Sequence, residues 1–104
     1  MESKKELILF RFTESAILNY YLKPYHDKGI LKKGQLISNP FLHPEKQKTP
    51  SFNFYQGKNG WRYHDFATGD HGDCFDLVMK LNSIGFVEAL DLIISDLNIS
   101  VWYD

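Results

Sequence analysis

Basic and aromatic side chains are interleaved between residues 32 and 62 of this 104-residue chain. Cations that neutralise phosphates and rings that stack on bases are the groups with which proteins bind single-stranded nucleic acid. The net charge of −1 conceals this concentration, because residues 23–62 carry +6 and residues 63–104 carry −7. A solvated basic face without a partner is the alternative interpretation of the charge alone. The candidate binding residues are Lys32, Lys33, Lys46, Lys48, Tyr55, Lys58, Trp61 and Arg62.

Other kinds of site are poorly supported by the residue types. The single Cys excludes an internal disulfide and any four-Cys metal site. Asp65, Asp70, Asp73 and Asp76 show no spacing typical of a magnesium site, and we expect them to serve as loop, cap and helix-start residues. Cys74 begins an apolar helical stripe, which favours an inert buried thiol. These residue types therefore give no support for nucleophilic or magnesium-dependent catalysis.

A hairpin is expected to position the rings. Phe52 and Phe54 alternate with polar residues, which places them on one strand face and Tyr55 on the other. We expect the two Phe rings in the core and Tyr55 exposed, while Trp61 suits either core packing or base stacking. The hairpin consists of a strand at 51–56, a Gly-rich turn at 57–60 and a returning strand at 61–66.

Helices are expected on both sides of this hairpin. Thr13 is a suitable N-cap for the first helix, and Pro24 ends it or closely follows its end. Asp73 is a suitable N-cap for the second helix. The full set of predicted elements is a helix at 13–23, a short strand at 35–38, the hairpin, a loop at 67–72, a helix from Asp73 and a helix at about 85–97.

These elements indicate an α+β fold in which a small antiparallel sheet is packed with about three helices. The length fits one domain over 1–104, with its leading helix at 13–23, its sheet within 35–66 and two helices within 73–97. No apolar run reaches the roughly 18 residues of a membrane span, and the N-terminus lacks a signal-peptide pattern. One Cys is compatible with a reducing compartment, so we expect a cytoplasmic location and no membrane partner.

Three segments carry a resemblance to a known family. They are NPFLHPEKQKTPSF (39–52), WRYHDFATGDHGDCFDLVMKL (61–81) and GFVEALDLI (85–93). In this order they resemble the N-terminal zinc-binding domain of bacterial and phage DnaG-type DNA primases. That family typically has Cys-Pro-Phe-His, Thr-Pro-Ser-Phe, a hairpin, Cys-x-x-Cys and Gly-Gly-Asp before two helices. The resemblance implies a zinc-ribbon-like sheet.

The zinc ligands of that family have no good counterparts in this chain. The ligand positions fall on Asn39, on His43 or Leu42, on Asp65 and on Thr68. Zinc prefers thiolate and imidazole ligands, and Asn and Thr supply neither. We therefore expect a degenerate form of the domain without zinc or another cofactor. The rings of the hairpin are expected to replace the cohesion of the metal, as a cluster of Phe52, Phe54, Trp61, Tyr63 and Phe66.

The resemblance also implies a role. It implies a non-catalytic domain that binds single-stranded DNA template and assists RNA primer synthesis in DNA replication, in a phage or mobile-element setting among others. Its partners would be single-stranded DNA and a primase polymerase domain or a replicative helicase. The alternative is a metal-free relative that binds replication proteins, with its acidic, helical C-terminal part as the contact surface.

Overall fold

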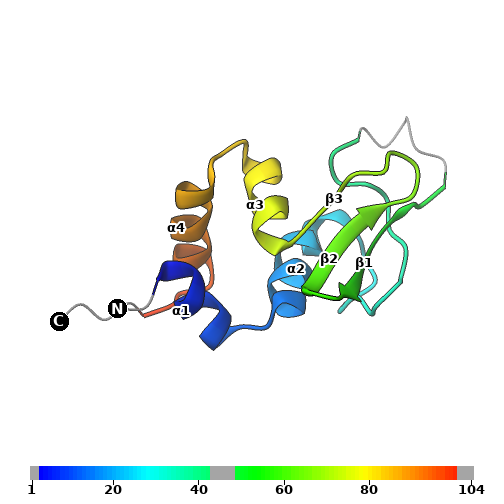
Figure 1. The fold of residues 1–104 in the computed structure, drawn as a ribbon. Coiled ribbons are helices and arrows are strands. Elements are labelled where there is room, and N and C mark those ends of the chain that lie inside the picture. The colour runs from blue at the N-terminus through cyan, green and yellow to red at the C-terminus, as the bar shows by residue number, and fades with distance from the viewer. Residues whose placement is uncertain (1–2, 43–48, 101–104) are drawn as a thin grey trace.

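The described part of the chain forms four α-helices, one short 3-10 helix and a three-stranded sheet (Figure 1). The computed structural model describes residues 3–42 and 49–100. Because the sheet is antiparallel and helices pack beside it, the predicted α+β class is confirmed. The elements are α1 (Lys4–Arg11), α2 (Glu14–Leu22), η1 (Lys23–Tyr25), β1 (Phe52–Gly57), β2 (Gly60–Asp65), β3 (His71–Gly72), α3 (Cys74–Asn82) and α4 (Phe86–Asp96).

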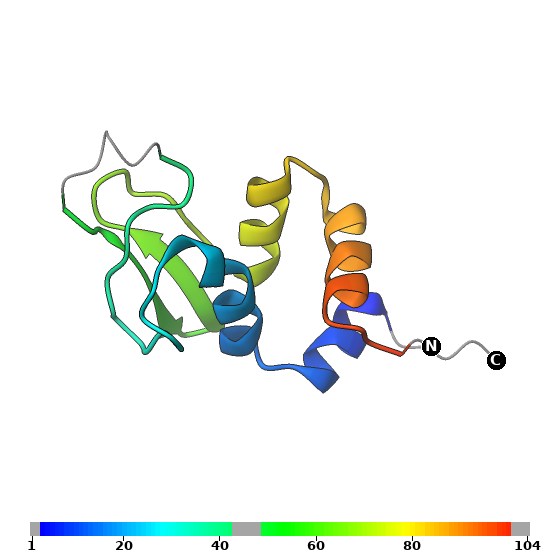
Figure 2. The ribbon, with the colours of Figure 1, turned by 180° about the vertical axis from the view of Figure 1, so that it is seen from behind.

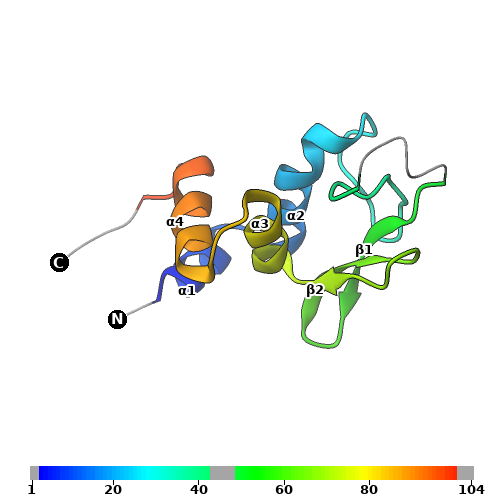
Figure 3. The same cartoon turned by 90° about the horizontal axis from the view of Figure 1, so that it is seen from above.

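The helices extend the molecule away from the sheet. Figures 1 and 3 show α2 and α3 next to the sheet, with α1 and α4 paired beyond them. The molecule is therefore elongated, with extents of 51 Å by 26 Å by 24 Å. None of the helices in residues 3–42 and 49–100 is long and apolar enough to cross a membrane. The sheet occupies one end of the molecule, and its strand order is β1–β2–β3.

The three predicted helices are confirmed, and two of them begin at their predicted N-caps. The Thr13 hydroxyl accepts a backbone N–H of the first turn of α2, and Pro24 lies in the η1 turn that follows this helix. Asp73 and Asp76 form a reciprocal capping box at the start of α3, and Gly85 is the N-cap of α4. The side-chain bonds of Thr13 and of the capping box satisfy N–H groups that have no partner inside the helix, so α2 and α3 begin where these caps are found.

The first helix, α1, was not among the predicted elements. Ile8 is the one fully buried residue of α1, and Phe10 is 79% exposed. Ser3 caps this helix, and Lys4 forms an ion pair with Asp91 on α4 at 2.6 Å. Packing against α4 stabilises α1, as is common for short helices.

Two predictions about the chain around the hairpin were wrong. The segment 35–38 is not a strand, since Ile37 alone forms a single bridge with Phe52. The segment 67–72 is not entirely a loop, because its last two residues form β3 and pair with β2. Both pairings join segments separated in the chain, and local residue patterns do not encode such contacts.

The hairpin itself is confirmed, and its turn is held by α2. Tyr55 on β1 lies opposite Arg62 on β2. Gly60 adopts a positive φ of 117°, which favours glycine, and a Cβ at this position would collide with the carboxylate of Glu14. One oxygen of that carboxylate also accepts the N–H of Trp61 at 3.4 Å. The first turn of α2 therefore fixes the end of the hairpin.

The rings on the inner face of the hairpin form the core of the sheet. Phe52, Phe54 and Tyr63 are buried, and the rings of Phe52 and Tyr63 stack with centroids 5.3 Å apart. Trp61 is half-buried, with its ring edge-to-face against Phe54 at 5.5 Å. Phe66 is 69% exposed, so its expected place in the core cluster is wrong. It follows β2 and lies beyond the buried face of the hairpin.

Candidate functional site

Polar and aromatic side chains gather on the outer face of the hairpin. Tyr55 and Arg62 are cross-strand partners, and strand alternation puts His64 on the same face as Arg62. His71 on β3 is paired with His64, and its Nδ1 lies 3.2 Å from an Arg62 guanidinium nitrogen. These residues and Lys58 of the turn line a shallow hollow of about 510 Å³. We call this set, Tyr55, Lys58, Arg62, His64 and His71, the hairpin face.

The hairpin face has the chemistry of an anion and base site. Lys58 and Arg62 supply permanent positive charge, and Arg62 can donate two hydrogen bonds to one phosphate. Tyr55 is 37% exposed and offers a ring at the centre of the face. The described residues that line the hollow include no carboxylate to oppose a phosphate. The face can therefore hold a phosphate beside a stacked base.

Three residues near this face were missed by the sequence prediction. His64 and His71 were not proposed for binding, and Phe66 was assigned to the core. The exposed ring of Phe66 meets the ring of His64 edge-to-face, with centroids 4.9 Å apart. Strand alternation could have identified His64, whereas His71 joins the face only through the pairing of β3 with β2. Phe66 extends the ring surface at the edge of the hairpin face.

The other predicted binding residues lie elsewhere or outside the described residues. Lys32 and Lys33 are exposed in a turn before Gly34, whose N–H donates to the Phe54 carbonyl at 2.9 Å. They therefore flank the edge of β1 that does not pair with β2. They belong to the segment after η1, which Figure 2 shows beside the sheet. Trp61 lies on the opposite face of the hairpin. Lys46 and Lys48 lie outside the described residues.

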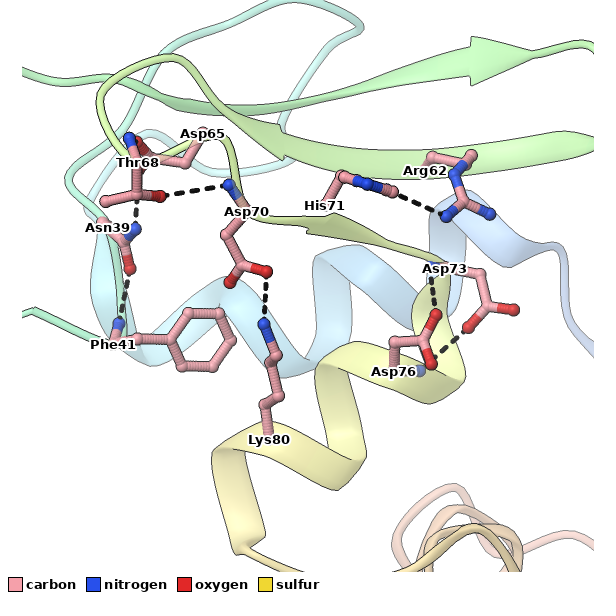
Figure 4. A network of polar contacts seen from close by, with 10 residues as sticks. All are labelled: Asn39, Phe41, Arg62, Asp65, Thr68, Asp70, His71, Asp73, Asp76 and Lys80. Atoms are coloured by element: carbon pink, nitrogen blue, oxygen red, sulfur yellow. Dashed lines mark hydrogen bonds and ion pairs between the residues drawn. The ribbon is translucent and has the colours of Figure 1, made fainter.

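Three of the positions that the resemblance assigns to zinc ligands meet at the other end of β2. Asn39, Asp65 and Thr68 come together there, and Figure 4 shows their polar contacts, while His43 lies outside the described residues. One Asp65 oxygen accepts the Asn39 amide N–H at 2.6 Å, and the other accepts the N–H groups of Ala67 and Thr68 at 2.7 and 2.9 Å. The Ser51 hydroxyl lies 3.1 and 3.0 Å from the two oxygens. Asp65 is completely buried in this network.

The described residues at these positions do not fit a zinc ion. Asn39 presents an N–H to Asp65, and its amide oxygen accepts the backbone N–H of Phe41 at 2.7 Å. The Thr68 hydroxyl accepts the Asp70 N–H at 3.2 Å. Within residues 3–42 and 49–100, no group of three or more His, Cys, Asp or Glu is placed to hold a metal ion. The donor set is one carboxylate, one amide and one hydroxyl, whereas structural zinc needs thiolates or imidazoles.

Hydrogen bonds control the ionisation of Asp65. Burial would raise the pKa of this carboxyl group, but bonds from the Thr68 N–H, the Asn39 amide, the Ser51 hydroxyl and the Ala67 N–H offset burial. The net result is a pKa below the ordinary Asp value. The buried carboxylate is therefore ionised at neutral pH.

Acid is expected to destabilise the fold through Asp65. A depressed pKa contributes stability that is complete above the unfolded value of about 4 and is lost as the pH falls through the folded value. Urea unfolding of the wild type and of Asp65→Asn, from about pH 7 to about pH 2.5, measures this contribution. The free energy of unfolding should fall more steeply below about pH 4 in the wild type. Equal slopes for the two proteins would contradict the assignment.

The remaining acids and the thiol have structural roles. Asp70 forms an ion pair with Lys80 of α3, and the ammonium group lies over the Phe41 ring at 5.5 Å. Asp73 and Asp76 cap α3, in agreement with their expected roles. Cys74 is buried, and burial raises the pKa of its thiol, as expected for an inert cysteine.

Comparison with known proteins shows the family to which this chain belongs. A family model of the DnaG zinc ribbon, described as the CHC2 zinc finger, matches residues 32–104. The chain is 33% identical over 57 residues to a DNA primase of Mycolicibacterium smegmatis, covering 55% of this chain and 9% of that protein. It is 40% identical over 52 residues to a DNA primase of Pasteurella multocida, covering 50% of this chain and 8% of that protein. The matched region thus spans less than a tenth of each relative.

Proposed function

Since this chain belongs to the CHC2 zinc-finger family of DnaG-type primases, we propose that it is a non-catalytic domain that binds single-stranded DNA and assists primer synthesis in DNA replication. The hairpin face is the observation that carries the proposal. The matched relatives are DNA primases more than ten times the length of the matched region. Their remaining length accommodates a polymerase domain, which we propose as the functional neighbour of this one.

The geometry of the hairpin face supports a single strand over a duplex. Tyr55 and Phe66 present exposed ring surface beside the cations of the hairpin, and bases must be unpaired to stack on protein rings. Lys58 and Arg62 lie next to Tyr55 and can neutralise the adjoining phosphates. Lys32 and Lys33 provide further charge beyond the far edge of β1. A single DNA strand that crosses the sheet would contact rings and cations together.

The acidic residues support a non-catalytic role. Metal-dependent phosphoryl transfer needs carboxylates that are free to coordinate magnesium. Asp65 is buried and accepts hydrogen bonds from four groups. Asp70 is paired with Lys80. Asp73 and Asp76 form hydrogen bonds at the start of α3. These four acids are committed to the fold, so we propose that primer synthesis belongs to the polymerase domain.

A second candidate is a module that binds replication proteins. It is favoured by exposed apolar side chains on α1 and α4, at the end of the molecule remote from the sheet (Figure 1). Phe10 is 79% exposed, and Val87 and Phe86 are also exposed. The two functions use different surfaces, so variants on the hairpin face distinguish them.

Replacing both Lys58 and Arg62 with Glu is expected to weaken binding to single-stranded DNA at least about tenfold. The variant should also reduce the slope of log affinity against log salt by about 2, because two phosphate contacts are lost. Fluorescence anisotropy of a labelled 20-nucleotide strand, measured over a range of salt concentrations, gives both quantities. Tyr55→Ala and Phe66→Ala should lower the affinity without changing the salt slope.

Lys28→Glu is the matched control, because Lys28 is exposed on the segment between η1 and β1, away from the hairpin face. It should retain most of the wild-type affinity. Absence of binding at low salt would reject the proposed function and favour the protein-binding module. If Lys28→Glu weakens binding as much as the double variant does, the hairpin face is not the binding site.

A further inference from the structure

The buried carboxylate of Asp65 lies where the family places a zinc ligand, yet the surrounding residues do not fit zinc. We propose that Asp65 replaces the metal as the centre that holds this end of the domain together. In a zinc site, anionic or lone-pair ligands surround a cation. Here an anion is surrounded by N–H and O–H donors, so the polarity of the site is reversed while its cross-linking role is retained.

The donors come from separate parts of the chain, as the ligands of a cross-linking metal do. Asn39 lies 26 residues before Asp65, and Ser51 lies 14 residues before it. Ala67 and Thr68 belong to the loop that follows β2. The carboxylate therefore joins the segment before β1, the first residues of the hairpin and the loop after it. A metal ion bound at 39, 65 and 68 would connect two of these, the segment before β1 and the loop after β2.

The hydrogen-bonding capacity of Asp65 is filled. A carboxylate has about four lone-pair sites. Four donors occupy them, namely the Asn39 amide, the Ser51 hydroxyl and the backbone N–H groups of Ala67 and Thr68. Bonds to an ionised acceptor are roughly twice as strong as neutral bonds, and burial protects them from competing water. Because its acceptor sites are all occupied, Asp65 both holds the surrounding segments together and has no site left for a cation.

A second contact ties the same loop to α3. The ammonium group of Lys80 pairs with Asp70 and lies over the rings of Phe41 and Tyr63, at 5.5 and 5.9 Å from their centroids. Figure 4 shows this pair close to the Asp65 network. Lys80 therefore links the helix, the loop after β2 and the segment that contains Phe41.

The first test measures the thermal midpoint of the 104-residue chain. Excess EDTA should leave the wild-type midpoint unchanged, whereas Asp65→Ala should lower it by more than about 10 °C, because four buried donors lose their acceptor. Asp70→Asn is the matched control in the same segment, and it should lower the midpoint by less than about 4 °C, since Asp70 forms a surface ion pair. A large drop with EDTA, or a small drop for Asp65→Ala, would overturn the proposal.

The second test restores thiolates at the three positions. A triple variant with Asn39→Cys, Asp65→Cys and Thr68→Cys should bind Co²⁺ at least about 100-fold more tightly than the wild type. Thiolate-to-cobalt absorption provides the readout, and it does not require an Asp65 variant that folds without metal. Equal Co²⁺ affinity for the two proteins would show that these positions do not form an exchanged metal site. Neither test measures DNA binding, so the proposal can fail independently of the proposed function.

Discussion

Replacing Phe52 with Ala is expected to lower the free energy of unfolding by about 3–5 kcal/mol, the usual range for a large buried ring. Phe52 is completely buried, and its ring stacks on Tyr63 and meets Phe41 edge-to-face. The substitution removes these ring contacts and leaves a cavity between the sheet and the segment before it. Small domains have only about 5–15 kcal/mol of stability, so most of the margin is lost.

Phe66→Ala is the matched control for this prediction. It makes the same chemical change in the same hairpin, but Phe66 is 69% exposed, so we expect a change within about 0.5 kcal/mol. Urea unfolding followed by circular dichroism measures both variants, and an unchanged m-value would confirm that the comparison concerns stability alone. Similar losses for the two variants would contradict the observed division between core and surface.

Replacing Gly72 with Ala is expected to destabilise the domain by about 2 kcal/mol or more, as overpacking at a closed contact does. A Cβ at this position would lie 2.7 Å from the Cβ of Asp76 and 2.8 Å from a ring carbon of Tyr63. The Asp76 Cβ is attached to the α3 backbone, and Tyr63 is buried, so neither neighbour can move without shifting its element. The clash would separate β3 from α3.

Gly85→Ala provides the comparison, because its added methyl group meets the flexible carboxylate end of the exposed Glu88 side chain. Gly85 is an N-cap with an ordinary φ of −83°, so we expect a loss below about 1 kcal/mol. Differential scanning calorimetry of the two variants tests the ranking. A Gly72→Ala midpoint equal to that of the wild type would show that β3 and α3 are not in close contact.

Much of the fold could be predicted because its signals are local. Thr13, Asp73 and Gly85 mark helix starts through bonds or geometry within one turn. The alternation of Phe52 and Phe54 identifies a strand and its buried face within a few residues. Interactions within a few residues depend on residue type and spacing, and both can be read from the sequence.

The remaining elements depend on contacts between distant segments. The helix α1 is stabilised against α4 by a pair such as Lys4 and Asp91, which are 87 residues apart. The strand β3 exists because it reaches β2 after a loop. Phe66 is as apolar as Phe52, and its exposure follows from its position one residue beyond β2. Composition and periodicity carry no information about these outcomes.

The residues of the candidate site likewise include some that local patterns predict and some that depend on the pairing of strands. Interleaved cations and rings predicted Tyr55, Lys58 and Arg62 as binding residues, and the structure places these three on one face. The same set included Trp61, which the register places on the other face, half-buried against Phe54. His71 could be added only once the pairing of β3 was known.

The absence of the family's thiolates can be read from the residues alone, because ligand chemistry is a property of residue type. The same holds for the places where rings and positive charges concentrate. The surroundings of Asp65 follow only from the folded chain, since the groups that donate to it lie as far as 26 residues away along the chain. A buried carboxylate is stable only when donors surround it, and that condition is met by the folding of three segments around one point.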